Sequence, residues 1–232
     1  MTKPPFVKNQ IYHIYNRGVE KRDIFMDKQD YLRFIHCLFA LNDQASFKNL
    51  TRISMSQVGL DSLEKYNTQK RKPRKLLVEI LVFCLMPNHF HLMLRQKTEN
   101  GIVRFMQKLG TAHAKYFNQK YDRVGPLFQG KFKAVLVEKN AHFLYLPHYI
   151  HINPLDLMGS KKMTSNTEKI KFLEKYKWSS LPDYMNIKNF PSVTQRDFLL
   201  ETFKKNGGYR NDVEKCIKTS TEDGDFNLIR GV

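Results

Sequence analysis

The sequence contains few cysteines and no two of them at metal-binding spacing. The three thiols, Cys37, Cys84 and Cys216, are an odd number, lie far apart and form no CxxC pair. This excludes a framework of paired disulfides and a CxxC-type metal or redox site. The three cysteines are therefore predicted to be small buried hydrophobic side chains in a reducing compartment.

The sequence also lacks a long uninterrupted apolar segment. Its longest apolar run, LLVEILVFCLMPNHFHLML, contains Glu79, Pro87, Asn88 and two histidines, so it predicts two strands joined by a turn and no membrane span. The first residues, MTKPPFVKNQ, do not resemble a signal peptide. We therefore expect a cytoplasmic protein that has no membrane partner.

Acidic residues are scarce relative to basic ones. Lys and Arg number 39 against 22 Asp and Glu, which gives a formal net charge of +17. This excess is larger than solubility requires and predicts a polyanionic partner, best matched by nucleic acid. The aromatic content of 12% suits stacking on bases. The alternative is a generically basic surface.

The hydrophobic pattern predicts alternating strands and helices up to residue 155. Gln10 to Arg17 alternates apolar and polar residues and stops at Gly18, which predicts an edge or second-layer strand. The next elements are predicted as a helix after an Asp27 cap, strands 76–85 and 88–95 in a hairpin around Met86 and Pro87, a helix over 100–121, a strand over 132–138 and a helix ending before Pro154. This order predicts an α+β fold of ferredoxin-like character, an antiparallel sheet with helices packed on it.

The composition divides the chain into two parts. Residues 1–155 are predicted to be the main domain, with a basic loop insertion over 45–75 that ends in a cationic run. The segment 156–232 is more polar and is predicted to be a small helical C-terminal extension, with helical stretches around Thr167 to Tyr176 and Thr194 to Lys205.

Two histidines share one face of the predicted second hairpin strand. His89 and His91 alternate with Phe90, so their imidazoles point to the same side and could form half of a metal site. Tyr149 and Asn153 would lie one helical turn apart, so the amide could be a third ligand and the phenol a nucleophile on a phosphate. The alternatives are a buried, hydrogen-bonded histidine pair, and a strand through YIHIN. Imidazole suits zinc better than magnesium, so the ligands alone do not fix the metal.

Five segments occur in the order in which similar segments occur in the single-tyrosine HUH transposases: YHIYNRGVEKRDIF, LVFCLMPNHFHLML, GPLFQGKFKAVLVE, YIHINPL and YKWSS. The sequence resembles this family over roughly Tyr12 to Pro154, and it is most similar to the branch of REP-associated tyrosine transposases, which resemble the insertion-sequence enzymes. His89-Phe90-His91 matches the family's histidine, hydrophobic, histidine motif. Tyr149 and Asn153 match its helix-borne tyrosine and the Asn or Gln four residues later. A departure is Pro147, two residues before Tyr149, where the family has other helix-forming residues.

The resemblance implies a transposase that cuts and rejoins single-stranded DNA. Tyr149 would form a covalent 5′-phosphotyrosine, and His89, His91 and Asn153 would bind a divalent metal, Mg²⁺ or Mn²⁺. The strand would be rejoined without a nucleotide cofactor, in the bacterial cytosol or nucleoid, and the C-terminal extension favours a monomer over a dimer. A replication or conjugation nickase of the same chemistry, and a domesticated hairpin-binding protein that no longer cuts, are the alternatives.

Such enzymes commonly recognise hairpins formed by folded single strands. Phe128 could stack on a base, although its place before a strand favours the core. The basic residues predicted from charge and position to contact this DNA are Arg17, Lys21, Arg22, Arg104, Lys108, Lys115, Arg123, Lys131 and Lys133.

Overall fold

The computed structural model describes residues 5–44, 74–159, 165–204 and 207–222. Its elements, in chain order, are β1 (Ile11–Arg17), η1 (Val19–Lys21), α1 (Lys28–Ala40), β2 (Val78–Met86), β3 (His89–Gln96), α3 (Gly101–Lys120), β4 (Lys133–Leu136), α4 (Asn140–Ile152), η3 (Asn153–Met158), α5 (Asn166–Lys175), α6 (Leu181–Tyr184), α7 (Asp197–Lys204) and α8 (Tyr209–Glu222).

Four strands form one antiparallel sheet in the order β2-β3-β1-β4. The order of elements from β1 to β4 is that of a ferredoxin-like unit, so the predicted α+β fold class is confirmed. One detail was wrong: β1 is not an edge or second-layer strand, because it pairs with β3 on one side and β4 on the other. Its outer neighbour β4 lies far along the sequence, and local patterning carries no information on such pairing.

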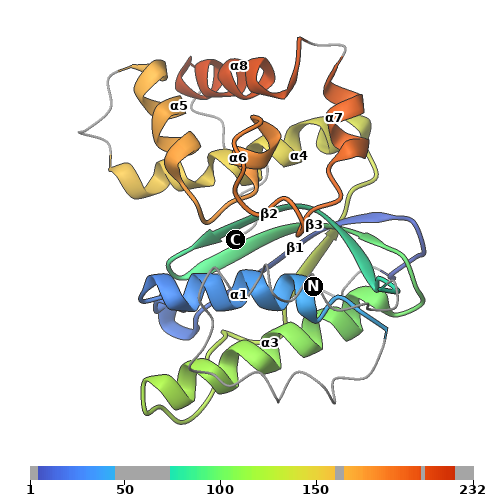
Figure 1. The fold of residues 1–232 in the computed structure, drawn as a ribbon, viewed down its shortest axis with the longest axis vertical. Helices are drawn as coiled ribbons and strands as arrows, with labels where there is room; N and C mark the ends of the chain where they lie inside the picture. The colour runs from blue at the N-terminus through green and yellow to red at the C-terminus, as the bar shows by residue number, and fades with distance from the viewer. Residues whose placement is uncertain (1–4, 45–73, 160–164, 205–206, 223–232) are drawn as a thin grey trace.

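The sheet separates two helical layers. Figure 1 shows α1 and α3 on one side and α4 to α8 on the other. Because side chains alternate along β3, the strand contributes residues to the cores on both sides of the sheet. Phe90, Leu92 and Leu94 belong to the core beneath α1 and α3, whereas Met93 belongs to the core that includes α4 and α8. His89 and His91 have the parity of Met93, so they point toward the α4 side.

The central apolar run forms the β2–β3 hairpin, as predicted. Pro87 and Asn88 make its turn, where the missing proline N–H costs no ladder hydrogen bond. The histidines and proline that argued against a membrane span are accommodated in this hairpin. Within the described ranges, no helix has the length and apolar character needed to cross a membrane.

Local signals also explain the first helix and α3. Asp27 caps α1 in a capping box with Asp30, whose side chain accepts from the Asp27 backbone N–H. On α3 the predicted apolar face is buried at Ile102, Phe105 and Leu109, and these residues join the core beneath the sheet. Both helices therefore lie where the sequence predicted them.

The C-terminal helices complete the layer that contains α4. Helices α5 and α7 coincide with the two predicted stretches, whereas α6 and α8 were not predicted. The segment Trp178 to Ser180 pairs with β2 through the backbone and covers that sheet edge, since Leu85 N donates to Trp178 O and Ser180 N to Phe83 O. The predicted insertion lies almost entirely outside the described residues, and the domain division at residue 155 stays a prediction.

Candidate active site

The two histidines of β3 lie side by side beneath α4. His89 is half-buried beside the hairpin turn, and His91 is only 2% exposed. Their ring centroids are 5.0 Å apart, with the ring planes nearly perpendicular. Both imidazoles are therefore on the α4 side of the sheet, as the alternation of the strand predicted.

The side chain of Asn88 determines which nitrogen of His89 carries the proton. Asn88 Nδ2 donates to the carbonyl oxygen of Lys21 at 3.2 Å, so Asn88 Oδ1 is the atom that faces His89 Nδ1, at 2.6 Å. An amide oxygen only accepts hydrogen bonds. His89 therefore donates from Nδ1, and Nε2 of the neutral ring keeps a lone pair.

That lone pair faces a second acceptor. Asn153 Oδ1 lies 3.2 Å from His89 Nε2. Burial, opposed by the contact with Asn153 and reinforced by the charge of Arg17, lowers the pKa of His89 to about 4, so the ring is neutral at neutral pH. Two facing acceptors repel unless a cation lies between them. An imidazole nitrogen and an amide oxygen are both metal ligands, so this arrangement fits a divalent ion.

His91 contacts a third imidazole. Its Nδ1 lies 2.9 Å from Nε2 of His13 on β1, and both side chains are 2% exposed. Burial lowers the pKa of His91 well below its ordinary value, and the nearby His13, His89 and Arg17 lower it further. Burial and His142 lower the pKa of His13 to about 3. Both rings are therefore neutral, and the 2.9 Å contact is a hydrogen bond between neutral imidazoles.

Tyr149 lies edge-on to these rings. Its ring centroid is 5.8 Å from that of His91 and 6.1 Å from that of His13, and both interplanar angles are 81°. Asn153 follows one turn later as the C-cap of α4. The structure thus brings together Tyr149, His89, His91 and Asn153, the four residues that the sequence grouped into one site. Their catalytic and metal-binding roles stay predictions.

Buried hydrogen bonds hold α4 between the sheet and the C-terminal helices. His151 Nδ1 lies 2.6 Å from the Tyr209 hydroxyl of α8, and His151 Nε2 lies 2.8 Å from Ser180 Oγ. Ser180 Oγ in turn accepts from the backbone N–H of Phe83 in β2, at 3.0 Å. This chain of contacts joins α8, α4 and β2. The placement of Tyr149 and Asn153 therefore depends on elements beyond residue 155.

Two further residues of α4, Pro147 and Tyr145, lie within one turn of Tyr149. Pro147 lies inside the helix, which continues past it to Ile152. Tyr145 lies one turn before Tyr149, with 6.2 Å between their ring centroids, and burial raises the pKa of Tyr145 to about 12. The residue four positions after Tyr145 is Tyr149 itself, so Tyr145 has no equivalent of Asn153.

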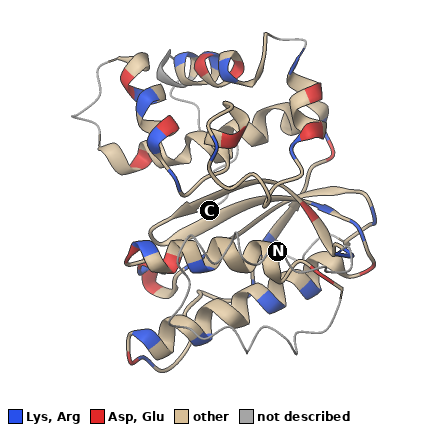
Figure 2. Cartoon of the chain, viewed as in Figure 1, with Lys and Arg blue, Asp and Glu red and all other residues tan. Residues whose placement is uncertain are grey.

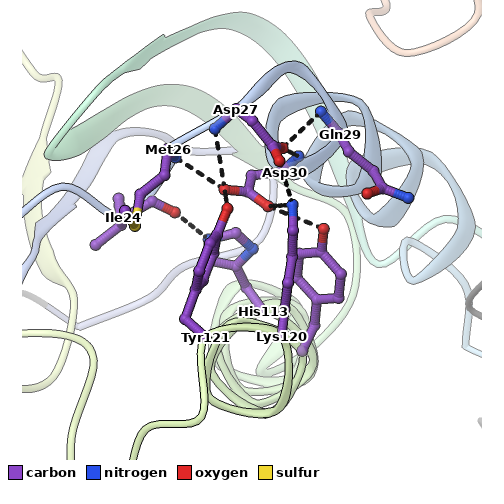
Figure 3. A network of polar contacts seen from close by, with 9 residues as sticks. Ile24, Met26, Asp27, Gln29, Asp30, His113, Lys120 and Tyr121 are labelled. Carbon is purple, nitrogen blue, oxygen red and sulfur yellow. Dashed lines mark hydrogen bonds and ion pairs between the residues drawn. The ribbon is translucent and has the colours of Figure 1, made fainter.

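Tyr116 belongs to a separate cluster, on the α1 and α3 side of the sheet. Its hydroxyl donates to Asp30 Oδ1 at 2.9 Å, and the same carboxylate accepts from Lys120, Tyr121 and the backbone N–H of Met26 at 2.7 to 2.8 Å (Figure 3). Burial raises the pKa of the Tyr116 phenol to about 12. Core packing and the bond to Asp30 therefore account for Tyr116.

The nine predicted DNA-contacting cations lie in two regions. Arg17 ends β1, and Lys21 and Arg22 follow it. This segment lies close to the hairpin turn, since Gly18 N donates to Asn88 O and Asn88 Nδ2 donates to Lys21 O. Arg17 is directly opposite His89 in the sheet, and its buried Nε has no hydrogen-bond partner among the residues that the structure describes. The other six lie on or after α3, where Figure 2 shows basic residues along the helix: Arg104, Lys108, Lys115, Arg123, Lys131 and Lys133. Lys108 donates to the carbonyl oxygen of Asp43 at 2.7 Å.

A groove of about 1160 Å³ lies between α3 and β4. Phe90, Phe128 and Phe132 line its apolar part, and Lys131 and Lys133 line its basic part. Phe128 is half-buried and also packs against the core, so the structure places it both in the core and in the wall of the groove.

The candidate ligand set consists of two neutral imidazoles, His89 and His91, and the amide oxygen of Asn153. In the part of the chain that the structure describes, no group of three or more His, Cys, Asp or Glu side chains could hold a metal ion. Any metal at this site therefore depends on the amide oxygen of Asn153 in addition to the two imidazoles.

Comparisons with known proteins bear on the part of the chain that contains the four site residues. Residues 64–153 match the family model described as Transposase IS200 like. The IS200-like segment contains His89, His91, Tyr149 and Asn153 and ends at the last of them; β1 and the C-terminal helices lie outside it. A solved structure described as the REP-associated tyrosine transposase bound to a REP hairpin aligns at a TM-score of 0.48 and 12% identity, over 85% of this chain and 92% of that chain. No curated protein matches the sequence.

Proposed function

We propose that this protein is a DNA transposase that cuts and rejoins single-stranded DNA through a covalent 5′-phosphotyrosine on Tyr149. The observation that carries the proposal is the convergence of Tyr149 with two neutral imidazoles and an amide oxygen. All four residues lie in the IS200-like segment. The facing acceptors His89 Nε2 and Asn153 Oδ1, 3.2 Å apart, support a cation between them.

A divalent metal, Mg²⁺ or Mn²⁺, would be held by His89, His91 and Asn153. When bound, such an ion acts as a Lewis acid on a phosphate oxygen. The hydrogen bond from His89 Nδ1 to Asn88 orients the ring so that Nε2 is available. The partly buried guanidinium of Arg17, opposite His89, has an Nε donor that no described residue accepts from, and such a donor suits a phosphate oxygen.

In the proposed reaction the phenol oxygen of Tyr149 attacks the phosphorus of a phosphodiester. The phenol loses its proton as a bond forms between its oxygen and phosphorus, the bond from phosphorus to the 3′-oxygen breaks, and the 3′-oxygen takes up a proton and leaves as a hydroxyl. An ordinary phenol has a pKa near 10, so only about one in a thousand is ionised at neutral pH, and nearby positive charge is needed to favour the phenolate. A second 3′-hydroxyl can reverse the step, because the phosphotyrosine bond conserves its energy.

The basic surface supports single-stranded or hairpin DNA as the substrate. Lys131 and Lys133 lie in the groove beside Phe128 and Phe132, and the combination of cations with aromatic rings suits unpaired nucleotides. The exposed cation Lys115 lies on α3, which also lines this groove. These residues would hold the strand through its phosphates, while the histidine face would act on one bond.

A single chain supplies the whole candidate site. Helix α4 packs on β2 and β3 of its own chain, and His151 bonds to both Ser180 and Tyr209. These contacts within one chain fit the proposed monomer.

The test is a comparison of three Tyr→Phe variants, at Tyr149, Tyr145 and Tyr116. Each protein is incubated with labelled single-stranded hairpin DNA and Mn²⁺, then denatured, so that a covalent adduct migrates as a shifted band. We expect the adduct with wild type, Tyr145→Phe and Tyr116→Phe, and none with Tyr149→Phe. Hairpin binding by Tyr149→Phe should be unchanged, because only one oxygen is removed.

An adduct that persists in Tyr149→Phe would refute the assignment of the nucleophile. If wild type binds hairpins but never forms an adduct or a nick, the domesticated hairpin-binding alternative is correct. Cleavage that requires a plasmid origin sequence, with no joining of the products, would instead indicate a replication or conjugation nickase.

A further inference from the structure

His13 is a buried polar residue to which neither the sequence nor the proposed reaction assigns a role. It lies on β1, outside the IS200-like segment, and is 2% exposed. Its Nε2 is 2.9 Å from His91 Nδ1, and the two ring planes differ by only 23° with 5.1 Å between the centroids, so the rings meet edge to edge through this contact. Buried polar groups are nearly always hydrogen-bonded, so the contact with His91 is the one that accounts for the buried Nε2 of His13.

The two neutral imidazoles can share one proton in only two ways. Either His13 Nε2–H donates to His91 Nδ1, or His91 Nδ1–H donates to His13 Nε2. In the first case Nδ1 of His91 accepts the hydrogen bond and so carries no proton. The proton of the neutral ring is then on Nε2, and that nitrogen cannot bind a metal. In the second case the proton is on Nδ1, and Nε2 of His91 is available.

The neighbouring histidine shows the same pattern. His89 has its Nδ1–H taken by Asn88 Oδ1, whose orientation is fixed by the bond from Asn88 Nδ2 to Lys21 O. Its Nε2 is thereby left for the site that Asn153 Oδ1 faces. In both histidines a neighbouring side chain contacts Nδ1, and the partner comes from the hairpin turn in one case and from β1 in the other.

We infer that His13 is a positioning residue, which accepts the proton of His91 Nδ1 and so keeps His91 Nε2 available to a divalent metal. The inference rests on the proposed function, since it assigns His91 as a ligand. Partners of this kind set the tautomer and the orientation of metal-binding imidazoles, and their loss typically lowers metal affinity by about 10-fold to 100-fold. His13 itself would not contact the metal or the DNA.

The first measurement uses the unmodified, metal-free protein at neutral pH. Imidazole ¹⁵N chemical shifts, assigned with the His13→Gln and His91→Ala variants, distinguish a protonated from an unprotonated ring nitrogen. We expect His91 to carry its proton on Nδ1 and His13 to have an unprotonated Nε2. A proton on His91 Nε2 would overturn the inference, whether or not any variant folds.

The second measurement is Mn²⁺ affinity, from the electron paramagnetic resonance signal of free Mn²⁺ without DNA. His13→Phe keeps an aromatic ring but removes the acceptor, so we expect the dissociation constant to rise by about 10-fold to 100-fold. In His13→Gln the amide oxygen restores an acceptor, and affinity should recover to within about 3-fold of wild type. The matched control is His113→Phe, a buried histidine on the other side of the sheet, which should leave Mn²⁺ affinity unchanged.

The His91→Ala variant separates the two levels of the hypothesis. If His91→Ala binds Mn²⁺ as tightly as wild type, the proposed metal site is wrong. If His91→Ala loses Mn²⁺ but His13→Phe binds it normally, the metal site stands and the role of His13 is refuted. Cleavage by His13→Phe should need about 10-fold to 100-fold more Mn²⁺ for half its maximal rate and then approach the wild-type rate, whereas a general folding defect would not be restored by metal.

Discussion

The side of the sheet that packs on α1 and α3 buries Asp30, whereas the opposite side, beneath α4, buries His13, His91 and Asn153. Each oxygen of Asp30 accepts at least two hydrogen bonds from donors of the same chain. Beneath α4, by contrast, Asn153 Oδ1 faces the unprotonated Nε2 of His89. A polar cluster whose partners are all present rigidifies a fold, whereas one with facing acceptors is suited to bind a cation.

The charges of the two clusters reinforce this difference. Burial by itself raises the pKa of Asp30, but hydrogen bonds from Lys120, Met26, Tyr121 and Tyr116 outweigh it and hold the pKa below its ordinary value. The Asp30 cluster is therefore ionised and internally paired. The histidines beneath α4 are neutral, so that cluster has lone pairs and no bound proton to expel before a metal binds.

The largest expected effect is on catalysis, from a change beneath α4. His89→Ala removes one of the facing acceptors, and Lewis-acid activation contributes several kcal/mol, so strand cleavage should fall by about 10³-fold or more. Hairpin binding should remain within a few-fold of wild type, because phosphate contacts elsewhere supply most of the affinity. Nicking rates and gel-shift affinities in Mn²⁺ would check this. If His89→Ala cleaves at the wild-type rate, His89 is not a metal ligand in the active site.

The next effect is on stability, from the other side of the sheet. Asp30→Ala removes the acceptor of two tyrosine hydroxyls and one of the two carboxylates that Lys120 contacts, and breaking a buried ion pair costs about 3 to 5 kcal/mol. Urea unfolding at pH 7 measures this loss. The control is Asp27→Ala, which removes the exposed N-cap together with its half-exposed ion pair to Lys120 and should cost about 1 to 2 kcal/mol. The folded fraction of Asp30→Ala should still form the covalent adduct. If it does not, the Asp30 cluster is needed for catalysis as well as for stability.

A pH titration tests the histidine on the same side as Asp30. Burial, partly opposed by the hydrogen bond to Ile24 O and by Asp30, lowers the pKa of His113 to about 4. Between pH 6.5 and about 4 the unfolded chain therefore binds a proton that the folded chain excludes, and the free energy of unfolding falls as the pH falls. His113→Leu should flatten this decline by up to about 1.4 kcal/mol per pH unit. An unchanged slope would mean that His113 is charged when folded.

The smallest expected effect concerns a single surface cation. Lys115 is exposed on α3, and its replacement by Ala should weaken hairpin binding by a few-fold and reduce the slope of log affinity against log salt by about 1. The cleavage rate at saturating DNA should not change. Lys171→Ala, an exposed lysine of α5 in the opposite layer, is the control and should leave the slope unaltered. Equal effects of the two variants would argue against a DNA-binding surface on the α3 side.

Local periodicity was sufficient for most elements and for the grouping of the four site residues. Strand alternation put His89 and His91 on one face, and helical spacing put Tyr149 one turn before Asn153. Helix α6 has four residues, too few for periodicity to reveal it. Helix α8 was missed although its buried residues Tyr209, Val213 and Ile217 recur at helical spacing. The interior position of β1 was missed for a different reason, because pairing with β4 joins segments more than a hundred residues apart.

The sequence by itself thus determined which side chains are available, on which face of each element, and that the surface is basic. Only the tertiary structure decided which partners each of these side chains contacts. The bond between His13 and His91 spans 78 residues, that of Asn88 to Lys21 spans 67, and the contact of His89 with Asn153 spans 64. These contacts fix tautomers and lone pairs, and they form only when β1, the hairpin turn and α4 are packed together, which no local pattern encodes.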